Sequence, residues 1–150
     1  PEPAFDRALM FLSYRARSEK EVGKKLVQLG FSEKTVAATI DKLRALHYLN
    51  DETFAREWAR GRAEGRGYGP LRIERELRQK GIERSVIHEV VREAFGQGEG
   101  KDKARALLEK RFRGKDLGDR KILSRAVAFL QRRGYRSSVI TEVLGEPLDD

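Results

Sequence analysis

One sequence pattern occurs three times in this chain, and this internal repeat limits the folds open to it. The pattern is a leucine, three residues, a glycine, an apolar residue and, a few positions later, a valine, and it lies within 26–40, 77–91 and 130–144. The pattern glycines are 51 and 53 residues apart. Such an even period is typical of helical repeat proteins, in which each copy forms one structural unit. We therefore predict three similar units.

Each copy of the pattern predicts a helix, a stop and a second helix. Glycine favours a helix end because it adopts the left-handed conformation without the steric penalty of a Cβ atom. The apolar residue after each glycine is expected to fold back on the preceding turn; these residues are Phe31, Ile82 and Tyr135. Apolar residues then recur four positions apart, as on one face of a helix, in the pairs Val36/Ile40, Val86/Val90 and Val139/Val143. Each second helix is thus predicted to bury one face.

A further helix is predicted in front of each pair, so that each unit has three helices. The three leading helices are expected at 4–14, 51–66 and 101–112. Four signals mark helix starts: a capping box of Ser18 with Glu21, N-caps at Asp51 and Asp119, and a first-turn proline at Pro70. The glycine-rich segments 96–100 and 114–118 are the expected linkers, and 65–69 is the expected loop inside the second unit.

The predicted fold is all-α, with tandem three-helix repeats at 1–50, 51–98 and 99–150. A unit of about 50 residues buries too little apolar surface to be robust alone, so neighbouring units should pack in series. The result would be an elongated, curved body. Its concave face is the kind of surface with which repeat proteins hold large partners.

Composition narrows the class of partner. The 150 residues contain 32 Lys and Arg against 24 Asp and Glu, a net charge of +8, which favours a polyanion or an acidic protein as partner. There is no cysteine, which excludes disulfides and suits a reducing compartment. No apolar run approaches the roughly 20 residues that a membrane span requires. We expect a cytoplasmic monomer that binds no membrane.

Sequence signals of catalysis are weak. Neither a strand-led G-x-G-x-x-G nor a G-x-x-x-x-G-K-[ST] motif is present. The two histidines, His47 and His88, are 41 residues apart and lack a second ligand at helical spacing, so no metal site is predicted. Most carboxylates lie one helical turn from a basic residue, as Glu74 does from Arg78, which indicates salt-bridged surface. We predict a binding protein without cofactor, metal or catalytic residues.

Two basic clusters are the candidate binding surfaces, for a protein or for nucleic acid. The cluster in the second unit comprises Arg56, Arg60, Arg62, Arg66, Arg72 and Arg75, together with Tyr68, whose ring could stack on a base. The cluster in the third unit comprises Lys101, Lys103, Lys110 and Arg111. Arg56 and Arg60 lie one turn apart and opposite the Phe54/Trp58 stripe, so they are predicted to point outward. For both clusters a solvated helix surface, and for Tyr68 a packed loop residue, is the alternative interpretation.

Several short motifs resemble those of bacterial RecX proteins. They are Arg17-Ser18-Glu19, Tyr48-Leu49-Asn50-Asp51-Glu52 with Phe54-Ala55 and Trp58, Gly69-Pro70 with Arg72-Ile73, and Glu76-Leu77 with Lys80-Gly81-Ile82. The third copy, with Arg133-Gly134-Tyr135, resembles the more variable C-terminal part of that family, so the resemblance covers essentially the whole chain. Two positions depart from it, because the family often has leucine at Val22 and aspartate at Asn50.

The resemblance implies a regulator of the RecA recombinase. RecX-like proteins lie in the groove of the RecA filament on single-stranded DNA and inhibit strand exchange, ATP hydrolysis and co-protease function. An autonomous DNA-binding protein is the first alternative, because a helix, a turn and a second helix superficially resemble a helix-turn-helix. None of the three second helices pairs arginine with asparagine or glutamine for base reading, which argues against it. An enzyme is the second alternative and would need a site that the motifs do not show.

Overall fold

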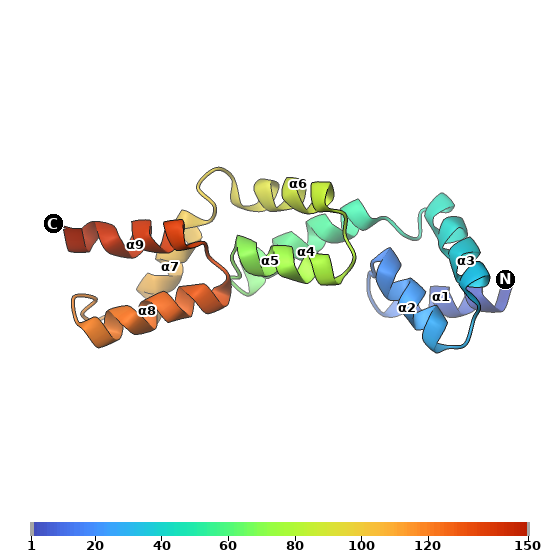
Figure 1. The fold of residues 1–150 in the computed structure, drawn as a ribbon, viewed down its shortest axis with the longest axis horizontal. Coiled ribbons are helices and arrows are strands. Elements are labelled where there is room, and N and C mark those ends of the chain that lie inside the picture. The colour runs from blue at the N-terminus through green and yellow to red at the C-terminus, as the bar shows by residue number, and fades with distance from the viewer. Residues whose placement is uncertain (1, 150) are drawn as a thin grey trace.

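The computed structural model describes residues 2–149, and the side chains of residues 3–145. Those residues form nine α-helices and no strand. The helices are α1 (Glu2–Tyr14), α2 (Glu19–Gln28), α3 (Glu33–Ala45), α4 (Asp51–Gly65), α5 (Pro70–Gln79), α6 (Arg84–Phe95), α7 (Lys101–Arg111), α8 (Arg120–Arg133) and α9 (Ser137–Asp149). They follow one another in three groups of three along an elongated body (Figure 1). The prediction of an all-helical chain of tandem three-helix units is confirmed.

Each group of three helices has its own hydrophobic core. Val22, Leu26 and Leu43 are among the buried residues at the centre of α1–α3. The core of α4–α6 includes Ile73 and Leu77, and the core of α7–α9 includes Leu130 and Tyr135. None of the three clusters contains residues from two groups. The units stand in series as predicted, but each buries its apolar residues internally instead of sharing an apolar face with its neighbour.

The repeated glycine ends a helix in the same way in all three units. Gly30, Gly81 and Gly134 have left-handed φ angles of 95°, 79° and 95°. The N–H of the following residue donates to the carbonyl of the pattern leucine, four positions before the glycine, at 3.2, 3.1 and 3.1 Å. The glycine N–H donates to the carbonyl three positions before it, at 2.9, 2.9 and 3.0 Å. This pair of bonds is the Schellman motif, so the prediction of three equivalent glycine stops is confirmed.

Most of the predicted helix starts are also confirmed. The Ser18 side chain accepts from the backbone N–H of Glu21, whose carboxylate accepts from the backbone N–H of Ser18, which completes the capping box of α2. Asp119 caps α8, and Pro70 occupies the first turn of α5. In these helices the local sequence determines the start, because the capping side chain and the amide it satisfies are three residues apart or fewer.

The predicted N-cap at Asp51 is wrong. The cap of α4 is Asn50, whose side chain accepts from the N–H of Thr53 at 3.1 Å. Asp51 lies in the first turn, and its carboxylate instead accepts from the backbone N–H of Glu19, in the first turn of α2, at 2.9 Å. Asp51 therefore satisfies an amide of a different helix in a different unit, and local sequence does not show that role.

The middle helices of the three units, α2, α5 and α8, meet end to end along the length of the molecule (Figure 1). Between the third and second units, Gly69 N–H donates to Arg133 O at 2.6 Å and Leu71 N–H to Gly134 O at 2.9 Å. The carbonyls left free at the end of α8 thus satisfy amides left free at the start of α5. A Cβ atom on Gly69 would lie 2.7 Å from the Gly134 carbonyl carbon, so this close approach requires glycine.

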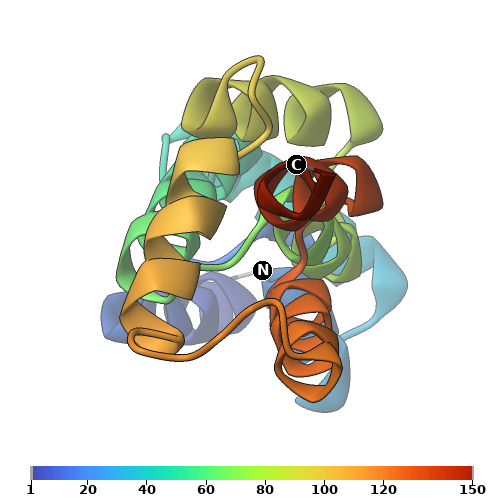
Figure 2. The ribbon, with the colours of Figure 1, turned by 90° about the vertical axis from the view of Figure 1, so that its left-hand side faces the viewer.

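The junction between the first and second units uses the same ends of the equivalent helices but depends on side chains. Gly81, after α5, packs against Lys20 in the first turn of α2, where a Cβ atom on the glycine would lie 2.7 Å from the Lys20 Cβ. Figure 2 views the molecule with the third unit nearest the reader and the other two behind it. The described helices include none long and apolar enough to cross a membrane.

Both glycine-rich segments predicted as linkers connect helices, and one of the two also connects units. Segment 96–100 joins α6 to α7 and so connects two units, as predicted. Segment 114–118 lies between α7 and α8, inside the third unit. The first and second units are joined by 46–50, where His47 has a left-handed φ of 66°. The segment that joins the first two units is therefore not glycine-rich, unlike the segment that joins the second and third.

Candidate functional site

Several cations of the second-unit cluster are bound within the protein. Arg56 Nε donates to Glu93 Oε2 at 2.8 Å, and its guanidinium lies 3.8 Å from Glu89. The hydrogen bond to Glu93 raises the pKa of Arg56, and the same bond lowers the pKa of Glu93. The Arg62 guanidinium lies over the Trp58 ring, 4.1 Å from its centroid. Arg56 points outward as predicted, but its guanidinium already forms an ion pair with Glu93 of α6.

Arg72 and Tyr68 form part of the junction between the second and third units. Arg72 Nε donates to Glu76 at 3.4 Å, its Nη1 donates to the Arg132 carbonyl at 3.3 Å, and its guanidinium lies 3.8 Å from the centre of the Tyr68 ring. The half-buried Tyr68 ring packs against the core of the second unit. Tyr68 is therefore a packed loop residue, and the hypothesis of a free ring that stacks on a base is not supported.

Other members of the two clusters are exposed and unpaired. Within the described part of the chain, Arg60, Arg66 and Arg75 have no ion pair, and all three are exposed. In the third unit, Lys101 donates to Glu142 at 2.7 Å, whereas exposed Lys110 and half-buried Lys103 have no such partner among the described residues. The predicted set thus divides into cations with an internal carboxylate or ring partner and cations that remain available.

The structure brings members of both clusters together in one cleft between the second and third units, which we name the 2–3 cleft. This cleft of about 470 Å³ is lined by Glu64, Gly65, Arg66, Gly67, Leu107, Lys110, Arg111, Phe129 and Arg133. Four of these residues are cations, and Glu64 is the one carboxylate among them. Arg60, Arg75 and Lys103 do not line it. Cations 45 residues apart in sequence therefore share a site that neither predicted cluster describes alone.

Two arginines of the 2–3 cleft share one aromatic ring. Arg111 lies 5.4 Å and Arg133 lies 5.0 Å from the centroid of buried Phe129. Arg133 Nη1 also donates to the backbone carbonyl of Arg66 at 2.5 Å. Such contacts restrain both guanidinium groups and leave other N–H groups free to bind a ligand.

Sequence reasoning did not include Arg133 in the candidate site, although the repeat contains a signal for it. The residue before the pattern glycine is Leu29, Lys80 and Arg133 in the three units. Lys80 donates a hydrogen bond to Glu21 of the first unit. Arg133 donates one to the backbone carbonyl of Arg66 in the second unit. Leu29, at the same position in the first unit, packs against the hydrophobic core of that unit. A cation at this position thus accompanies docking on a neighbour.

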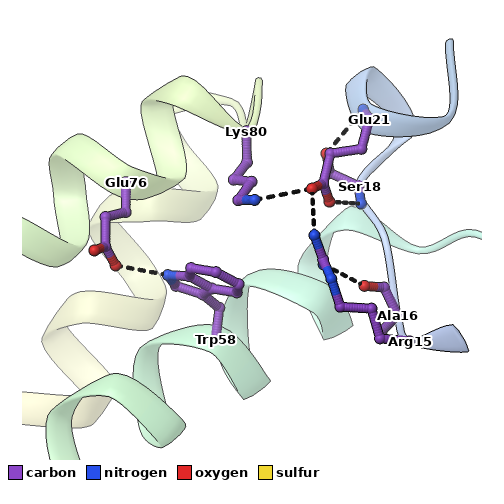
Figure 3. A network of polar contacts seen from close by, with 7 residues as sticks. All are labelled: Arg15, Ala16, Ser18, Glu21, Trp58, Glu76 and Lys80. Atoms are coloured by element: carbon purple, nitrogen blue, oxygen red, sulfur yellow. Dashed lines mark hydrogen bonds and ion pairs between the residues drawn. The ribbon is translucent and has the colours of Figure 1, made fainter. Parts of the chain in front are cut away.

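A second cleft lies at the junction of the first and second units. It has a volume of about 450 Å³ and is lined by Phe11, Lys20, Glu21, Lys24, Lys25, Gln28, Gln79 and Lys80. Here the cations surround a carboxylate: Glu21 accepts from Lys80 Nζ and from Arg15 Nη2, both at 2.8 Å (Figure 3). Burial alone raises the pKa of Glu21, but hydrogen bonds from Arg15, Lys80 and the Ser18 amide outweigh burial and lower it to about 2.

The same network continues into the second unit. Lys80 lies 4.7 Å from the centre of the Trp58 ring, and Trp58 Nε1 donates to Glu76 at 2.9 Å (Figure 3). The Lys80 ammonium is therefore held between a carboxylate of one unit and an aromatic ring of the other. The charge of Lys80 is thus neutralised within the protein, whereas Lys20, Lys24 and Lys25 of the same lining have no ion-pair partner among the described residues.

Glu74 has a partner that the sequence did not predict. The interpretation of Glu74 as a partner of Arg78 is wrong, because its carboxylate accepts from Arg136 Nη2 at 2.8 Å. Arg136 belongs to the third unit and also lies 2.9 Å from Glu99. This ion pair, like that of Lys80, connects two units.

The described residues offer no group of three or more His, Asp or Glu side chains that could hold a metal ion. The arrangement around the 2–3 cleft consists of cations, one acid and apolar residues. Such residues bind anionic groups by charge and hydrogen bonding, whereas general acid–base catalysis requires a positioned proton donor and acceptor.

Comparison with known proteins identifies the family. Models of the first, second and third three-helix domains of RecX match residues 4–43, 50–91 and 99–144. Regulatory protein RecX of Corynebacterium efficiens is 35% identical over 96% of this chain and 71% of that protein. Regulatory protein RecX of Trichlorobacter lovleyi is 30% identical over 95% of this chain and 94% of that protein.

The fold agrees with the sequence comparison. The crystal structure of RecX from Lactobacillus salivarius superimposes with a TM-score of 0.82 at 25% identity, over 97% of this chain and 94% of that one. Three consecutive domain matches, full-length relatives and a shared architecture lead to one conclusion: the chain belongs to the RecX family of bacterial regulatory proteins.

Proposed function

We propose that this protein binds the RecA filament on single-stranded DNA and inhibits its recombinase, ATPase and co-protease activities. The observation that carries the proposal is membership of the RecX family over the whole length of the chain. The elongated series of units supports it, because such a body presents a long surface to an extended partner. The unpaired cations of the 2–3 cleft add positive charge suited to a nucleoprotein filament.

The mechanism that fits this architecture is binding without chemistry. A protein that occupies the filament surface opposes growth and the conformational cycle of the filament through its binding free energy alone. Three units in series give several contacts along one filament, and linked contacts raise overall affinity without any new interaction type. The protein would act as a cytoplasmic monomer and require no cofactor.

The test is the DNA-dependent ATPase of RecA on single-stranded DNA with increasing amounts of this protein. We expect the rate to fall as the protein saturates the filament. A rate that stays unchanged while co-sedimentation shows the protein bound to the filament would refute inhibition. Failure to co-sediment would refute the proposed partner itself.

An autonomous helix-turn-helix DNA-binding protein is less well supported. In such a protein the second helix of the motif enters the major groove, where phosphates line both sides. The candidate helix of the central unit is α6, and it exposes Glu89 and Glu93 beside Arg56. Carboxylates on that face oppose entry into a polyanionic groove. Sequence-selective binding to duplex DNA would nevertheless reverse this judgement.

A further inference from the structure

Cations without an ion-pair partner among the described residues gather in the 2–3 cleft, although the cleft at the first junction also has three such cations, Lys20, Lys24 and Lys25, beside its ion pair. At the junction of the first and second units, Lys80 is paired with Glu21. On the other side of the second junction, Arg72 is paired with Glu76 and Arg136 with Glu74. In the 2–3 cleft, by contrast, none of the four cations has an ion-pair partner among the described residues. Those cations are Arg66, Lys110, Arg111 and Arg133.

Like charges held close together cost free energy unless an anion relieves the repulsion. Here contacts within the protein restrain two of the cations. Arg111 and Arg133 share the Phe129 ring, and the Arg66 carbonyl anchors Arg133. Because these groups are already positioned, a ligand loses less side-chain entropy when it binds them. The cleft therefore presents cations that are partly positioned before any ligand binds.

We infer that the 2–3 cleft binds the phosphodiester backbone of a nucleic-acid strand, with the four cations on neighbouring phosphates. The planar fork of arginine matches phosphate oxygens, and three of the four cations are arginines. Binding of this kind is independent of base sequence. The inference deepens the proposed function, since it concerns the DNA that is part of the filament, but the site does not require RecA.

The lining of the cleft favours phosphates over an acidic peptide. Peptide partners usually anchor an apolar or aromatic side chain in a pocket. The apolar residues of this cleft are Leu107 and Phe129, and the Phe129 ring is 6% exposed beneath two guanidinium groups. Five of the nine lining residues are charged and two are glycines, so the lining offers little apolar side chain to such an anchor. A repeated, purely anionic backbone fits better.

The site also connects two units. Arg66 belongs to the second unit, whereas Lys110, Arg111 and Arg133 belong to the third. A strand bound across the cleft would therefore stabilise the present arrangement of these two units, because it binds only when both contribute their charges. Binding of DNA and the shape of this half of the molecule are thus linked.

The experiment measures binding of a fluorescein-labelled oligothymidine strand by fluorescence anisotropy over a range of salt concentrations, without RecA. The variant R66Q/K110Q removes one exposed cation from each side of the cleft. We expect roughly tenfold weaker binding at low salt, and a salt slope shallower by about 1.4, since each phosphate contact on a single strand contributes about 0.7. The full-length protein is used throughout, and circular dichroism checks that helicity is unchanged.

The matched control is K34Q/R84Q, which removes two exposed cations from α3 and α6, neither of which lines the cleft. Both variants have the same net charge. Equal losses in the two variants would overturn the inference, because they would show dependence on total charge alone. No binding of the oligonucleotide by the unmodified protein would also overturn it.

Two further arms separate the remaining possibilities. If oligoglutamate competes as well as oligothymidine on an equal-charge basis, the cleft is a general acidic-ligand site and the inference fails. RecA ATPase inhibition by R66Q/K110Q is measured in parallel. If R66Q/K110Q binds the oligonucleotide weakly but still inhibits RecA ATPase, the result supports both the DNA site in the cleft and the proposed function. If the unmodified protein does not inhibit RecA ATPase, the proposed function alone is refuted.

Discussion

Gly30 and Gly134 have the same backbone conformation but different surroundings. Both have a φ of 95°, yet a Cβ atom on Gly30 would have no neighbour within 4 Å, whereas one on Gly134 would lie 2.6 Å from the backbone nitrogen of Arg72. One residue type therefore has two roles. Both glycines end a helix, and Gly134 also permits contact with the preceding unit.

Alanine substitutions separate these two roles. Gly30→Ala should destabilise the protein by about 1 kcal/mol, the cost of placing a non-glycine residue in the left-handed region. Gly134→Ala should cost clearly more, because α5 must also shift away from the added methyl group. Urea unfolding followed by circular dichroism measures both. Equal losses would show that the close approach at Gly134 does not contribute to stability.

Glu21 should make stability depend on pH at the acidic end. Its pKa is about 2 in the folded protein, below the value near 4.3 of an unfolded chain. A lowered pKa means that the carboxylate stabilises the fold above pH 4 to 5 and that this contribution disappears as pH falls towards 2. Glu21→Gln should therefore cost about 2 to 3 kcal/mol at neutral pH.

The measurement is unfolding of the unmodified and Glu21→Gln proteins between pH 7 and pH 3. The difference in unfolding free energy should narrow as pH falls through this range. Glutamine retains the capping-box acceptor, so the variant tests the charge specifically. A difference that is constant with pH would contradict the role assigned to Arg15 and Lys80.

At the scale of the element, helix ends explain both confirmed and wrong predictions. Ser18 and Asp119 cap their own helices, and their pattern is legible within three residues of sequence. Asp51 is also a short polar residue at a helix start, but its carboxylate accepts from an amide of α2. The two situations look alike in sequence because both place a short polar side chain before an apolar run.

Substitution of Asp51 tests this contact between helices. Asp51→Ala leaves the Glu19 amide without its acceptor and should cost about 1 to 2 kcal/mol. Glu52→Ala is the control, since Glu52 is an exposed acid in the same first turn. Chemical unfolding compares the two. If both variants lose the same unfolding free energy, the effect comes only from the favourable interaction of an acid with the helix N-terminus.

At the scale of the whole molecule, three separate cores are joined by two junctions of different chemistry. The second junction has backbone hydrogen bonds from Gly69 and Leu71 to the end of α8. The first depends on the ion pair of Lys80 with Glu21 and on the side chain of Asp51. Exposed or partly exposed ion pairs weaken with salt, whereas backbone hydrogen bonds depend on it little. The first junction should therefore be the more adjustable.

A fluorescence energy-transfer pair, with one dye on the first unit and one on the second, measures this difference. Lys80→Gln should broaden the distribution of distances between the dyes, and added salt should broaden it in the unmodified protein. Lys24→Gln is the control, because Lys24 lines the same cleft without an ion pair in the described residues. An unchanged distribution for Lys80→Gln would show that the ion pair does not hold the junction.

Local sequence patterns account for the three units, their helices and most helix ends. These features arise from local rules, since a glycine stop, a capping side chain or an apolar face involves residues within a few positions of one another. The motif resemblance likewise led to the RecX family, which the comparisons confirmed.

The availability of each cation, in contrast, depends on packing between helices. Arg56 and Arg72 meet carboxylates of their own unit, whereas Arg66 and Lys110, 44 positions apart, meet across a cleft. Sequence gives the number of charges on a helix, but neutralisation depends on distances of a few ångströms between elements far apart in the chain. The contacts between units are polar and few, so no apolar periodicity marks them in the sequence.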